Sequence, residues 1–599
     1  MADGGGASIK PPMIDPTALL RDTFGFPGFR GVQRQVVDRV LAGDRTLAVM
    51  PTGAGKSLTY QLPAVALPGT CVVVSPLIAL MHDQLRAALA VGIRAATLTS
   101  VDADRNETIA RYRAGELDLL YVAPERASND GFRQLLASAP LALFAIDEAH
   151  CVSEWGHDFR PDYRLLRPLL DAFPDVPRLA LTATADEHTR ADILDQLGIP
   201  ADGLIVAGFD RPNIRYMIAP RESTTRQVAD FIAEQSGPGI VYAQTRAGVE
   251  RLAEALAGKG RPVLPYHAGL DPAVRRENQA KFVASEDMVM VATIAFGMGI
   301  DKPDVRFVVH AGLPKSIEAY YQETGRAGRD GDPAVAQLFW GADDFARARQ
   351  RMGEVEPHRQ PGERARLTAL GALVETATCR RAILLRHFGE TPPASCGNCD
   401  NCLSPPAAID ATEVARKFLS AVYRTGQSFG AGHIEAVLTG KANEKVRQRG
   451  HDQLSVFNIV TDEEAPLVKP VSRALLLRDA LRTSEHGGLE FGPEARGILK
   501  GEVPVALVLP PRPERRRQRG GAVPNPVGDP LFEALRAARR ELAMDAGVPP
   551  YVIFHDSTLR EMAQVKPTSH KALGQISGVG SRKLDDYGDA FLNVIRAFV

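Results

Sequence analysis

The segment Met50-Pro51-Thr52-Gly53-Ala54-Gly55-Lys56-Ser57 decides the fold of the first part of the chain. The apolar run 46–50 that precedes it predicts a buried strand of a parallel sheet, and the apolar pattern of 58–62 predicts a helix. Between strand and helix, two glycines allow backbone N–H groups to turn toward a phosphate at the helix N-terminus. The segment therefore predicts a nucleotide-binding loop; the alternative is a glycine-rich turn with an incidental Lys-Ser pair.

The residues of this loop have distinct expected roles. Lys56 is expected to reach the β- and γ-phosphates of ATP, and the Ser57 hydroxyl is expected to hold Mg²⁺. The loop residues expected around the phosphates are Thr52, Gly53, Gly55, Lys56 and Ser57. A loop of this kind usually has a small residue where Met50 stands, so the match is incomplete. Because Met50 ends the predicted strand, it need not touch phosphate.

Composition limits the class of protein. With 599 residues, 45% of them hydrophobic and 24% charged, the chain is long enough for about four domains. The net charge of −1 requires any nucleic-acid contact to use local basic patches. The sequence shows neither a membrane-spanning apolar run nor a secretory signal, which predicts a cytoplasmic, nucleoid-associated protein without membrane contact.

Residues 14–206 alternate short apolar runs with helical patterns, which predicts a parallel sheet covered by helices on both faces. Ligands of such sheets bind at the carboxyl ends of the strands. The predicted strand 143–146 ends directly in Asp147 and Glu148. Asp147 can hold Mg²⁺ opposite Ser57, while Glu148 can orient or deprotonate the attacking water. The alternative is an acidic pair that caps the next helix.

Residues 207–345 repeat the strand–helix alternation after an extended connector at 209–216. This second lobe has no Gly-Lys-Ser loop, so we expect it to close on the nucleotide held by the first lobe. Its predicted strand ends carry groups that can contact the phosphates of a bound strand, namely Arg246, His267 and Thr293.

The segment 321–331 closes the second lobe and contains Arg326 and Arg329. Because they are three residues apart, the two arginines are expected on one side of a helical turn. Arg329 can then act as an arginine finger on the γ-phosphate, with Arg326 beside it in the site. The alternative is a pair of surface arginines next to a glycine-rich turn.

Four of the six cysteines lie close together within 346–407, namely Cys379, Cys396, Cys399 and Cys402. One distant thiol and a Cys-x-x-Cys-x-x-Cys run provide four soft ligands, which fits a closed, structural Zn²⁺ site. An iron–sulfur cluster also takes four thiolates and is the alternative. Without an export signal, the clustering favours metal over disulfides. The neighbouring basic residues, expected either to meet DNA phosphates or to form a solvated face, are Arg380, Arg381 and Arg386.

Asp147-Glu148-Ala149-His150 resembles the Asp-Glu-x-His motif of superfamily 2 helicases, and two further motifs narrow the resemblance to the RecQ family. The segment 24–33 is similar to the family's adenine-reading motif, in which Gln33 would pair with adenine while Phe26 and Arg30 sandwich the ring. The segment 150–161 is similar to the family's aromatic-rich loop, which couples single-strand binding to ATP hydrolysis. The DNA-contacting residues implied there are Trp155, His157, Phe159 and Arg160.

The resemblance covers nearly the whole chain. It implies an α/β protein with two RecA-like parallel-sheet lobes, followed by a zinc-binding subdomain, a winged-helix domain and a small all-helical HRDC-like domain. The expected divisions are a disordered N-terminus at 1–13, the lobes at 14–206 and 207–345, the zinc-binding subdomain at 346–407, the winged helix at 408–509, a Pro/Arg-rich linker at 510–526 and the HRDC-like domain at 527–599. Within the winged helix, 450–455 matches the family and 456–464 departs from it.

The family implies an ATP-dependent DNA helicase that moves 3′→5′ on single-stranded DNA and unwinds duplex or branched DNA in recombination and repair. The implied partners are DNA, single-strand-binding proteins and repair proteins. One alternative is an RNA helicase, for which the aromatic loop and the zinc module are unusual. The other is an ATP-gated DNA-binding scaffold, which would need a broken catalytic set, whereas Lys56, Asp147, Glu148 and Arg329 are all present.

Overall fold

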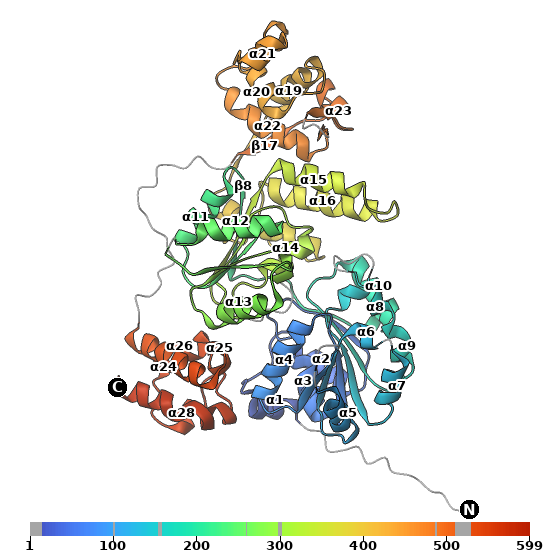
Figure 1. The fold of residues 1–599 in the computed structure, drawn as a ribbon, viewed down its shortest axis with the longest axis vertical. Coiled ribbons are helices and arrows are strands. Elements are labelled where there is room, and N and C mark those ends of the chain that lie inside the picture. The colour runs from blue at the N-terminus through green and yellow to red at the C-terminus, as the bar shows by residue number, and fades with distance from the viewer. Residues whose placement is uncertain are drawn as a thin grey trace, which may run out of the picture.

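The computed structural model describes residues 15–598 except 100, 101, 103, 128, 154–158, 259, 297–301, 485–487 and 510–528. Two sheet-containing lobes lie next to each other, with a helical winged-helix domain at one end and a small helical domain beside both lobes (Figure 1). The predicted N-terminal segment 1–13 and the linker 510–526 lie outside the described residues. No helix in the described part of the chain is both long and apolar enough to span a bilayer.

The first lobe is built on a parallel sheet with the strand order β3-β4-β2-β5-β6-β1-β7. Its strands are β1 (Thr46–Val49), β2 (Thr70–Val74), β3 (Ala95–Leu98), β4 (Leu119–Val122), β5 (Leu141–Ile146), β6 (Arg178–Thr182) and β7 (Leu204–Val206). Apart from the edge strand β7, the strands are almost fully buried because helices cover both faces of the sheet, as their continuous apolar runs predict. Strand β1 pairs with β6 so that Val49 lies opposite Thr182, which brings the segments after both strands to the same sheet edge.

Helices surround this sheet and carry the loops of the site. They are α1 (Pro16–Phe24), α2 (Gln33–Leu41), α3 (Leu58–Ala66), α4 (Ile78–Ala90), α5 (Arg105–Arg113), α6 (Pro124–Ala127), α7 (Asp130–Leu136), α8 (Pro161–Arg164), α9 (Leu166–Asp171) and α10 (Glu187–Leu197), with 3₁₀ turns η1 (Ala149–Val152) and η2 (Ala201–Gly203). Asp186 caps α10 by accepting a hydrogen bond from the Thr189 N–H, as a short acidic side chain at this position typically does.

The second lobe contains a parallel sheet with the order β10-β11-β9-β12-β13-β8. Its strands are β8 (Ile214–Pro220), β9 (Gly239–Tyr242), β10 (Val263–Tyr266), β11 (Val289–Ala292), β12 (Phe307–His310) and β13 (Ala334–Trp340). Its helices are α11 (Thr224–Ala233), α12 (Arg246–Leu256), α13 (Pro272–Ala284) and α14 (Ile317–Thr324), with the 3₁₀ turn η3 (Ile294–Phe296). The two sheets confirm the predicted pair of parallel-sheet lobes.

The cysteine-containing module packs against the second lobe and the connector. It includes α15 (Ala342–Met352), α16 (Gln360–Glu375), α17 (Arg380–His387) and α18 (Asp400–Leu403). Arg380 and Arg381 are only 6% and 5% exposed, so the expected basic surface at these two residues is wrong. Arg380 pairs with Asp400, and Arg381 donates to the Ile214 carbonyl, because guanidinium groups can satisfy several buried acceptors at once. Arg386 is exposed.

The winged-helix domain has its own hydrophobic core. Its elements are β14 (Ala407–Asp410), α19 (Thr412–Arg424), α20 (Ala431–Leu438), α21 (Glu444–Gln448), η4 (His451–Gln453), α22 (Ala465–Leu477), β15 (Leu481–Thr483), β16 (Leu489–Phe491), α23 (Ala495–Lys500) and β17 (Ala506–Leu509). Strands β15 and β16 pair antiparallel and form a short wing. The divergent segment 456–464 lies in turns that precede α22 and therefore leaves the wing strands in place.

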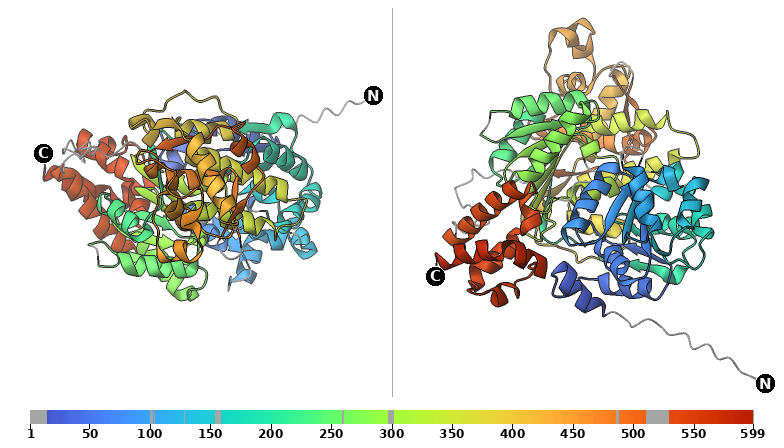
Figure 2. Two further views of the ribbon diagram at one scale, coloured as in Figure 1. Left: turned by 90° about the horizontal axis from the view of Figure 1, so that it is seen from above. Right: turned by 60° about the horizontal axis from the view of Figure 1, so that its bottom comes forward.

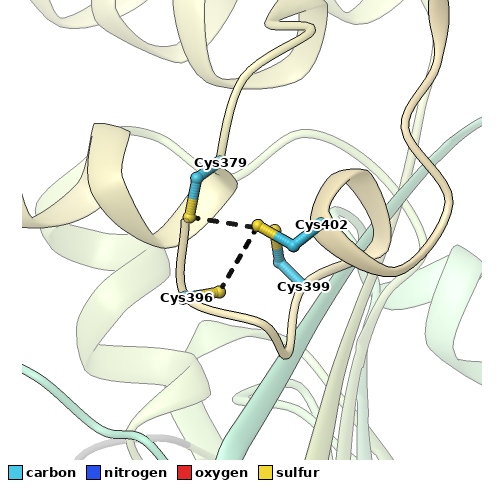
Figure 3. A group of neighbouring side chains, drawn as sticks. All are labelled: Cys379, Cys396, Cys399 and Cys402. Carbon is cyan, nitrogen blue, oxygen red and sulfur yellow. Dashed lines mark hydrogen bonds between the residues drawn. The ribbon is translucent and has the colours of Figure 1, made fainter. Parts of the chain in front are cut away.

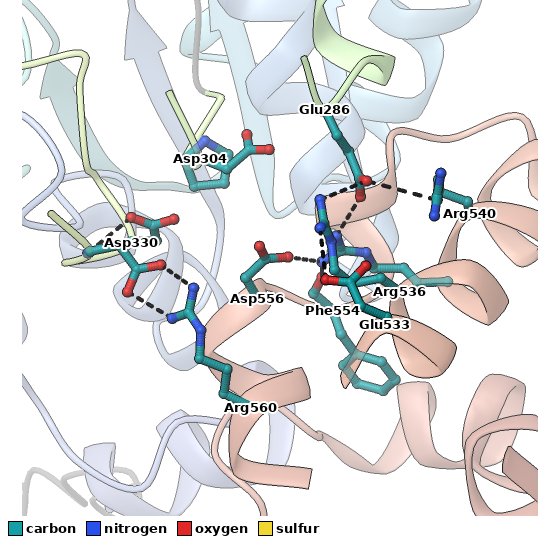
Figure 4. Close-up of polar contacts among 12 residues, drawn as sticks. Glu286, Asp304, Asp330, Glu533, Arg536, Arg540, Phe554, Asp556 and Arg560 are labelled. Atoms are coloured by element: carbon teal, nitrogen blue, oxygen red, sulfur yellow. Dashed lines mark hydrogen bonds and ion pairs between the residues drawn. The ribbon is translucent and has the colours of Figure 1, made fainter. Parts of the chain in front are cut away.

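The C-terminal domain is helical, with α24 (Pro530–Ala546), α25 (Pro550–Ile553), α26 (Asp556–Val565), α27 (His570–Leu573) and α28 (Ser581–Arg596) around a separate apolar core. It packs beside both lobes (Figures 1 and 2). Arg536 bonds the Glu286 carboxylate of the second lobe (Figure 4). Arg539 bonds the other oxygen of the same carboxylate. On the first lobe, the Gly578 N–H donates to the Gly25 carbonyl at 3.2 Å.

Candidate nucleotide site and zinc centre

The phosphate loop forms between β1 and α3, as predicted. Gly53 and Gly55 have φ angles of +84° and +72°, which residues with a Cβ adopt only with strain. Ser57 stands immediately before α3, where it is close to the backbone N–H groups of the helix N-terminus. The Met50 side chain is buried in the core, and its carbonyl accepts a hydrogen bond from Lys56 Nζ at 3.2 Å. Met50 therefore supports Lys56 through its carbonyl without contributing its side chain to the site.

The adenine-reading motif is joined directly to the phosphate loop. Gln33 is 4% exposed, and its Nε2 donates to the Ala54 carbonyl at 2.8 Å. Its Oε1 accepts from the Arg30 N–H at 2.8 Å. The Arg30 side chain is exposed and Phe26 is half-buried. A nucleotide base that pairs with Gln33 would therefore also affect the position of the loop that carries Lys56.

Asp147 and Glu148 lie immediately after β5, at the predicted sheet edge. Asp147 is buried, and its carboxylate accepts from Gln84 Nε2 at 3.4 Å and from the Glu148 N–H at 3.0 Å. Burial and, to a smaller extent, the Glu148 carboxylate raise the pKa of Asp147, Lys56 opposes both, and the net value is about 6. A divalent cation fits here, because it would stabilise this buried carboxylate in its charged form.

Polar side chains are in contact from Glu148 through His150 to Thr182. Glu148 has φ = 48°, a strained value for a residue with a Cβ, and this conformation turns its side chain toward His150. His150 Nδ1 lies 3.4 Å from Glu148 Oε2 and 3.0 Å from Thr182 Oγ1. His150 belongs to the Asp-Glu-x-His motif, but no signal in the sequence predicts that its ring lies next to Thr182.

Arg326 and Arg329 of the second lobe lie beside the phosphate loop. Helix α14 ends at Thr324, so both arginines are in the turns that follow the helix rather than on a helical turn. An ideal Cβ at Gly53 would lie 3.3 Å from Arg329 Cγ. Arg326 is 5% exposed, and its Nε is a buried donor with no hydrogen-bond partner among the described residues. An anionic oxygen fits such a donor.

The predicted strand-contacting residues of the second lobe lie at three strand ends. Arg246 begins α12 after β9 and is exposed, while Thr293 follows β11 and is half-buried. His267 follows β10 and is 3% exposed, with its Nε2 3.2 Å from Glu250 Oε1. An ideal Cβ at Gly269 would lie within 3.3 Å of both Arg246 Nη1 and His267 Nδ1, so these two side chains are neighbours.

The aromatic-rich loop is only partly described. Trp155 and His157 lie outside the described residues. Phe159 is half-buried, and the Arg164 guanidinium lies 5.4 Å from its ring centroid. Arg160 Nη1 donates to the Pro76 carbonyl at 2.9 Å, which ties the end of this loop to the segment after β2.

The four predicted cysteines come together at one point (Figure 3). Their sulfur atoms all lie within 4.8 Å of one another. A tetrahedral Zn²⁺ with Zn–S bonds of about 2.3 Å separates its ligand sulfurs by about 3.8 Å, so the arrangement fits zinc. All four ligand positions are protein thiols, which leaves no open position for catalysis. The site is structural.

Five family models match the chain in sequence order. They are a DEAD/DEAH box helicase model at 30–193, a helicase conserved C-terminal domain at 223–331, a RecQ zinc-binding model at 342–403, an RQC domain at 405–516 and an HRDC domain at 529–595. The zinc-binding model settles the choice between zinc and an iron–sulfur cluster in favour of Zn²⁺. ATP and Mg²⁺ are the cofactors expected of a DEAD/DEAH box helicase.

Two bacterial relatives match over nearly their whole length. An ATP-dependent DNA helicase RecQ of Haemophilus influenzae is 44% identical, with 97% of this chain and 96% of the relative covered. The protein of the same name from Bacillus subtilis is 38% identical, with 97% and 98% covered. A crystal structure of the DUF1998 helicase MrfA bound to DNA matches 60% of this chain and 57% of its own at 19% identity and a TM-score of 0.48, so the assignment depends on the sequence relatives. The chain belongs to the RecQ family of ATP-dependent DNA helicases.

Proposed function

We propose that this chain hydrolyses ATP between its two lobes and uses the resulting lobe movement to travel along single-stranded DNA and separate duplex or branched DNA. The observation that carries the proposal is the contact between the phosphate loop of the first lobe and the arginine-bearing turn of the second, at Gly53 and Arg329. Because the site is divided between the two lobes, its geometry changes when the lobes separate. ATP binding and hydrolysis can therefore drive movement of one lobe relative to the other.

In the proposed reaction, Lys56 would neutralise the β- and γ-phosphates, and Asp147 and Ser57 would hold a Mg²⁺ ion that offsets further negative charge. Glu148 orients the attacking water, and His150 holds the Glu148 carboxylate in place through the contact at 3.4 Å. Arg329 and Arg326 stabilise the charge that develops on the transferred phosphoryl group. Each role is assigned to a group that follows a strand of the first sheet or to one in the turn after α14 of the second lobe.

DNA would bind across the same ends of the lobes. Arg246, His267 and Thr293 would follow the backbone of one strand, with Arg246 supplying an exposed positive charge. Phe159 and Arg160 would extend this path onto the first lobe, together with Trp155 and His157. A base stacked on an aromatic ring contributes about 1–3 kcal/mol, so loss of such contacts weakens strand binding strongly.

The experiment that tests this proposal measures ATP hydrolysis and strand separation on tailed duplexes of DNA and of RNA, each with a 3′ or a 5′ tail. We expect DNA-stimulated hydrolysis and unwinding of the 3′-tailed DNA. Lys56→Ala should abolish both activities, and the exposed-residue variant Arg226→Lys should retain both. Hydrolysis without strand separation would favour a translocase or an ATP-gated scaffold. Activity confined to RNA tails would favour an RNA helicase.

The same proposal implies a location at chromosomal DNA, and interactions with single-strand-binding and repair proteins. Co-purification of such proteins with the tagged chain after nuclease treatment would test the second point, because nuclease removes associations that DNA alone mediates.

A further inference from the structure

The connector between the lobes contains an arginine that the proposed reaction does not use. Arg211 precedes β8 and is half-buried. Its Nη1 donates to the Thr52 carbonyl at 2.6 Å and to the Gly325 carbonyl at 3.1 Å. Its Nη2 donates to the carbonyls of Ala327 and Gly328 at 2.9 and 3.0 Å. One guanidinium therefore bonds both the loop that carries Lys56 and the turn that carries Arg326 and Arg329.

These four bonds lie where the two loops meet. An ideal Cβ at Gly325 would be 3.3 Å from Thr52 Cβ, so the two backbones are already close at this point. The next residue of the phosphate loop, Gly53, contacts Arg329. Arg211 thus lies at the point where the turn with Arg329 approaches the phosphate loop.

The chemistry of arginine suits this position. Its planar group presents several donors in fixed directions, whereas the lysine ammonium is a compact charge on a flexible stem. A lysine at residue 211 would keep the positive charge but could not bond carbonyls of both loops with the same geometry. Arg211→Lys therefore tests the hydrogen-bond geometry of this side chain separately from its charge.

The zinc-binding module supports the connector on both sides of Arg211. Asn398, which lies between two zinc-binding cysteines, donates from Nδ2 to the Pro212 carbonyl at 3.1 Å. Phe388 stacks on Phe209 with ring centroids 4.5 Å apart and an angle of 11° between the rings. The connector therefore has fixed contacts immediately before and after Arg211, which limits the freedom of the guanidinium.

We propose that Arg211 is a positioning residue for ATP hydrolysis: it sets the distance between the phosphate loop and the arginine-finger turn, and the zinc-binding module holds it in place through the connector. This inference rests on the proposed function, because it concerns the same ATPase site. Arg211 acts through Arg329 and bonds only backbone carbonyls of the two loops in the contacts described.

The test is a double-mutant cycle of Arg211→Lys and Arg329→Ala in the full-length protein. The measured quantities are kcat for DNA-stimulated ATP hydrolysis, the dissociation constant of a fluorescent ATP analogue and the thermal midpoint. A misplacement of about 1 Å costs about 10²-fold in rate, so Arg211→Lys alone should lower kcat by roughly 30- to 100-fold. Affinity for the analogue should change by less than about threefold, because Lys56 remains in place.

In the Arg329→Ala background, Arg211→Lys should lower kcat by no more than about threefold, since the group that it positions is already absent. The inference would be overturned if Arg211→Lys lowered kcat by the same factor with and without Arg329→Ala. It would also be overturned if Arg211→Lys alone left kcat unchanged. Arg226→Lys, at an exposed site on α11, is the matched control and should not change kcat. Failure of the proposed function is distinct, because the unmodified protein would then show no DNA-stimulated hydrolysis at all.

Discussion

Gly53 and Arg329 lie next to each other although they are 276 positions apart in the sequence: an ideal Cβ at Gly53 would lie 3.3 Å from Arg329 Cγ and 3.4 Å from its Cβ. Gly53 belongs to the phosphate loop of the first lobe, and Arg329 to the turn after α14 of the second. The lack of a side chain at Gly53 allows the two lobes to approach each other at this point.

Substitution of Gly53 by alanine should impair hydrolysis more than stability. The new methyl group would occupy the space next to Arg329, and the φ of +84° would be strained. We expect kcat to fall by about tenfold or more, because the finger is displaced from the phosphate. Gly43→Ala is the control: φ there is +90°, but nothing lies within 4 Å of the added methyl group. Both variants should lose about 1 kcal/mol of stability from the backbone strain alone. Equal kcat values in the two variants would contradict the account.

Replacement of Cys399 by alanine should remove the metal. The remaining three thiols leave the tetrahedral site incomplete, and metal binding contributes directly to folding of such modules. Elemental analysis should show zinc falling from about one per chain to nearly zero, with a lower thermal midpoint. Cys71→Ala changes a buried thiol in β2 and should leave the zinc content unchanged. Full zinc retention in Cys399→Ala would show that the four sulfurs are not the ligands.

An ion pair between the zinc-binding module and α14 should make stability depend on pH. His387 Nε2 bonds Glu318 Oε1, and this bond together with the charge of Glu318 raises the pKa of His387 against the effect of burial, with Asp186 adding to the rise. In turn, although burial acts in the opposite direction, His387 holds the pKa of Glu318 at about 2. The stabilisation from His387 is complete below its unfolded pKa of 6.5 and is lost as pH rises through the raised value. The stabilisation from Glu318 is complete above 4.5 and is lost as pH falls toward 2.

The pair should therefore contribute most between about pH 4.5 and 6.5. Thermal midpoints of the unmodified protein and of His387→Gln, measured from pH 4 to 9, should differ most in that window and converge at higher pH. The surface pair His358–Glu356 provides the control, because both side chains are largely exposed and His358→Gln should have little effect at any pH. A constant difference across the whole range would rule out the pair as the cause.

The C-terminal helical domain should be released from the lobes by charge reversal at one contact. Arg560 bonds Asp332 through both guanidinium nitrogens, at 2.7 and 2.5 Å. Asp332→Arg should weaken docking and increase hydrogen exchange at the Gly578 amide, which donates to Gly25 of the first lobe. A loss of about 1.4 kcal/mol corresponds to a tenfold increase in the open population. The double variant Asp332→Arg with Arg560→Asp should restore protection; failure of this rescue would mean that the contact does not hold the domain.

The sequence predicted the parts of the site that lie next to each other along the chain. Gly53 to Ser57 and Asp147 to Glu148 follow apolar strands, and the edge of a parallel sheet brings strand ends together, so their proximity is predictable. Cys396, Cys399 and Cys402 are likewise close in sequence. In each of these cases, the spacing of the residues along the chain is enough to predict that their side chains lie close together.

Other features depend on contacts between distant segments. Arg380 and Arg381 look like surface residues in sequence but bond buried carbonyl and carboxylate groups. Arg211 lies in a segment that sequence describes only as extended, and its four acceptors are backbone carbonyls, which carry no sequence signature. The docking of the C-terminal domain depends on charges that are hundreds of residues apart, such as Glu286 and Arg539.

The central claim is that the two lobes share one catalytic site, and Arg329→Ala tests it most directly. The measurement is the steady-state kcat of single-strand-stimulated ATP hydrolysis, with affinity for an ATP analogue determined on the same preparation. The account predicts that kcat falls by about 10³-fold or more, since an arginine finger contributes 10³–10⁵ in rate, while affinity changes by only a few-fold. A kcat within about threefold of the unmodified protein would contradict the claim that the second lobe completes the site.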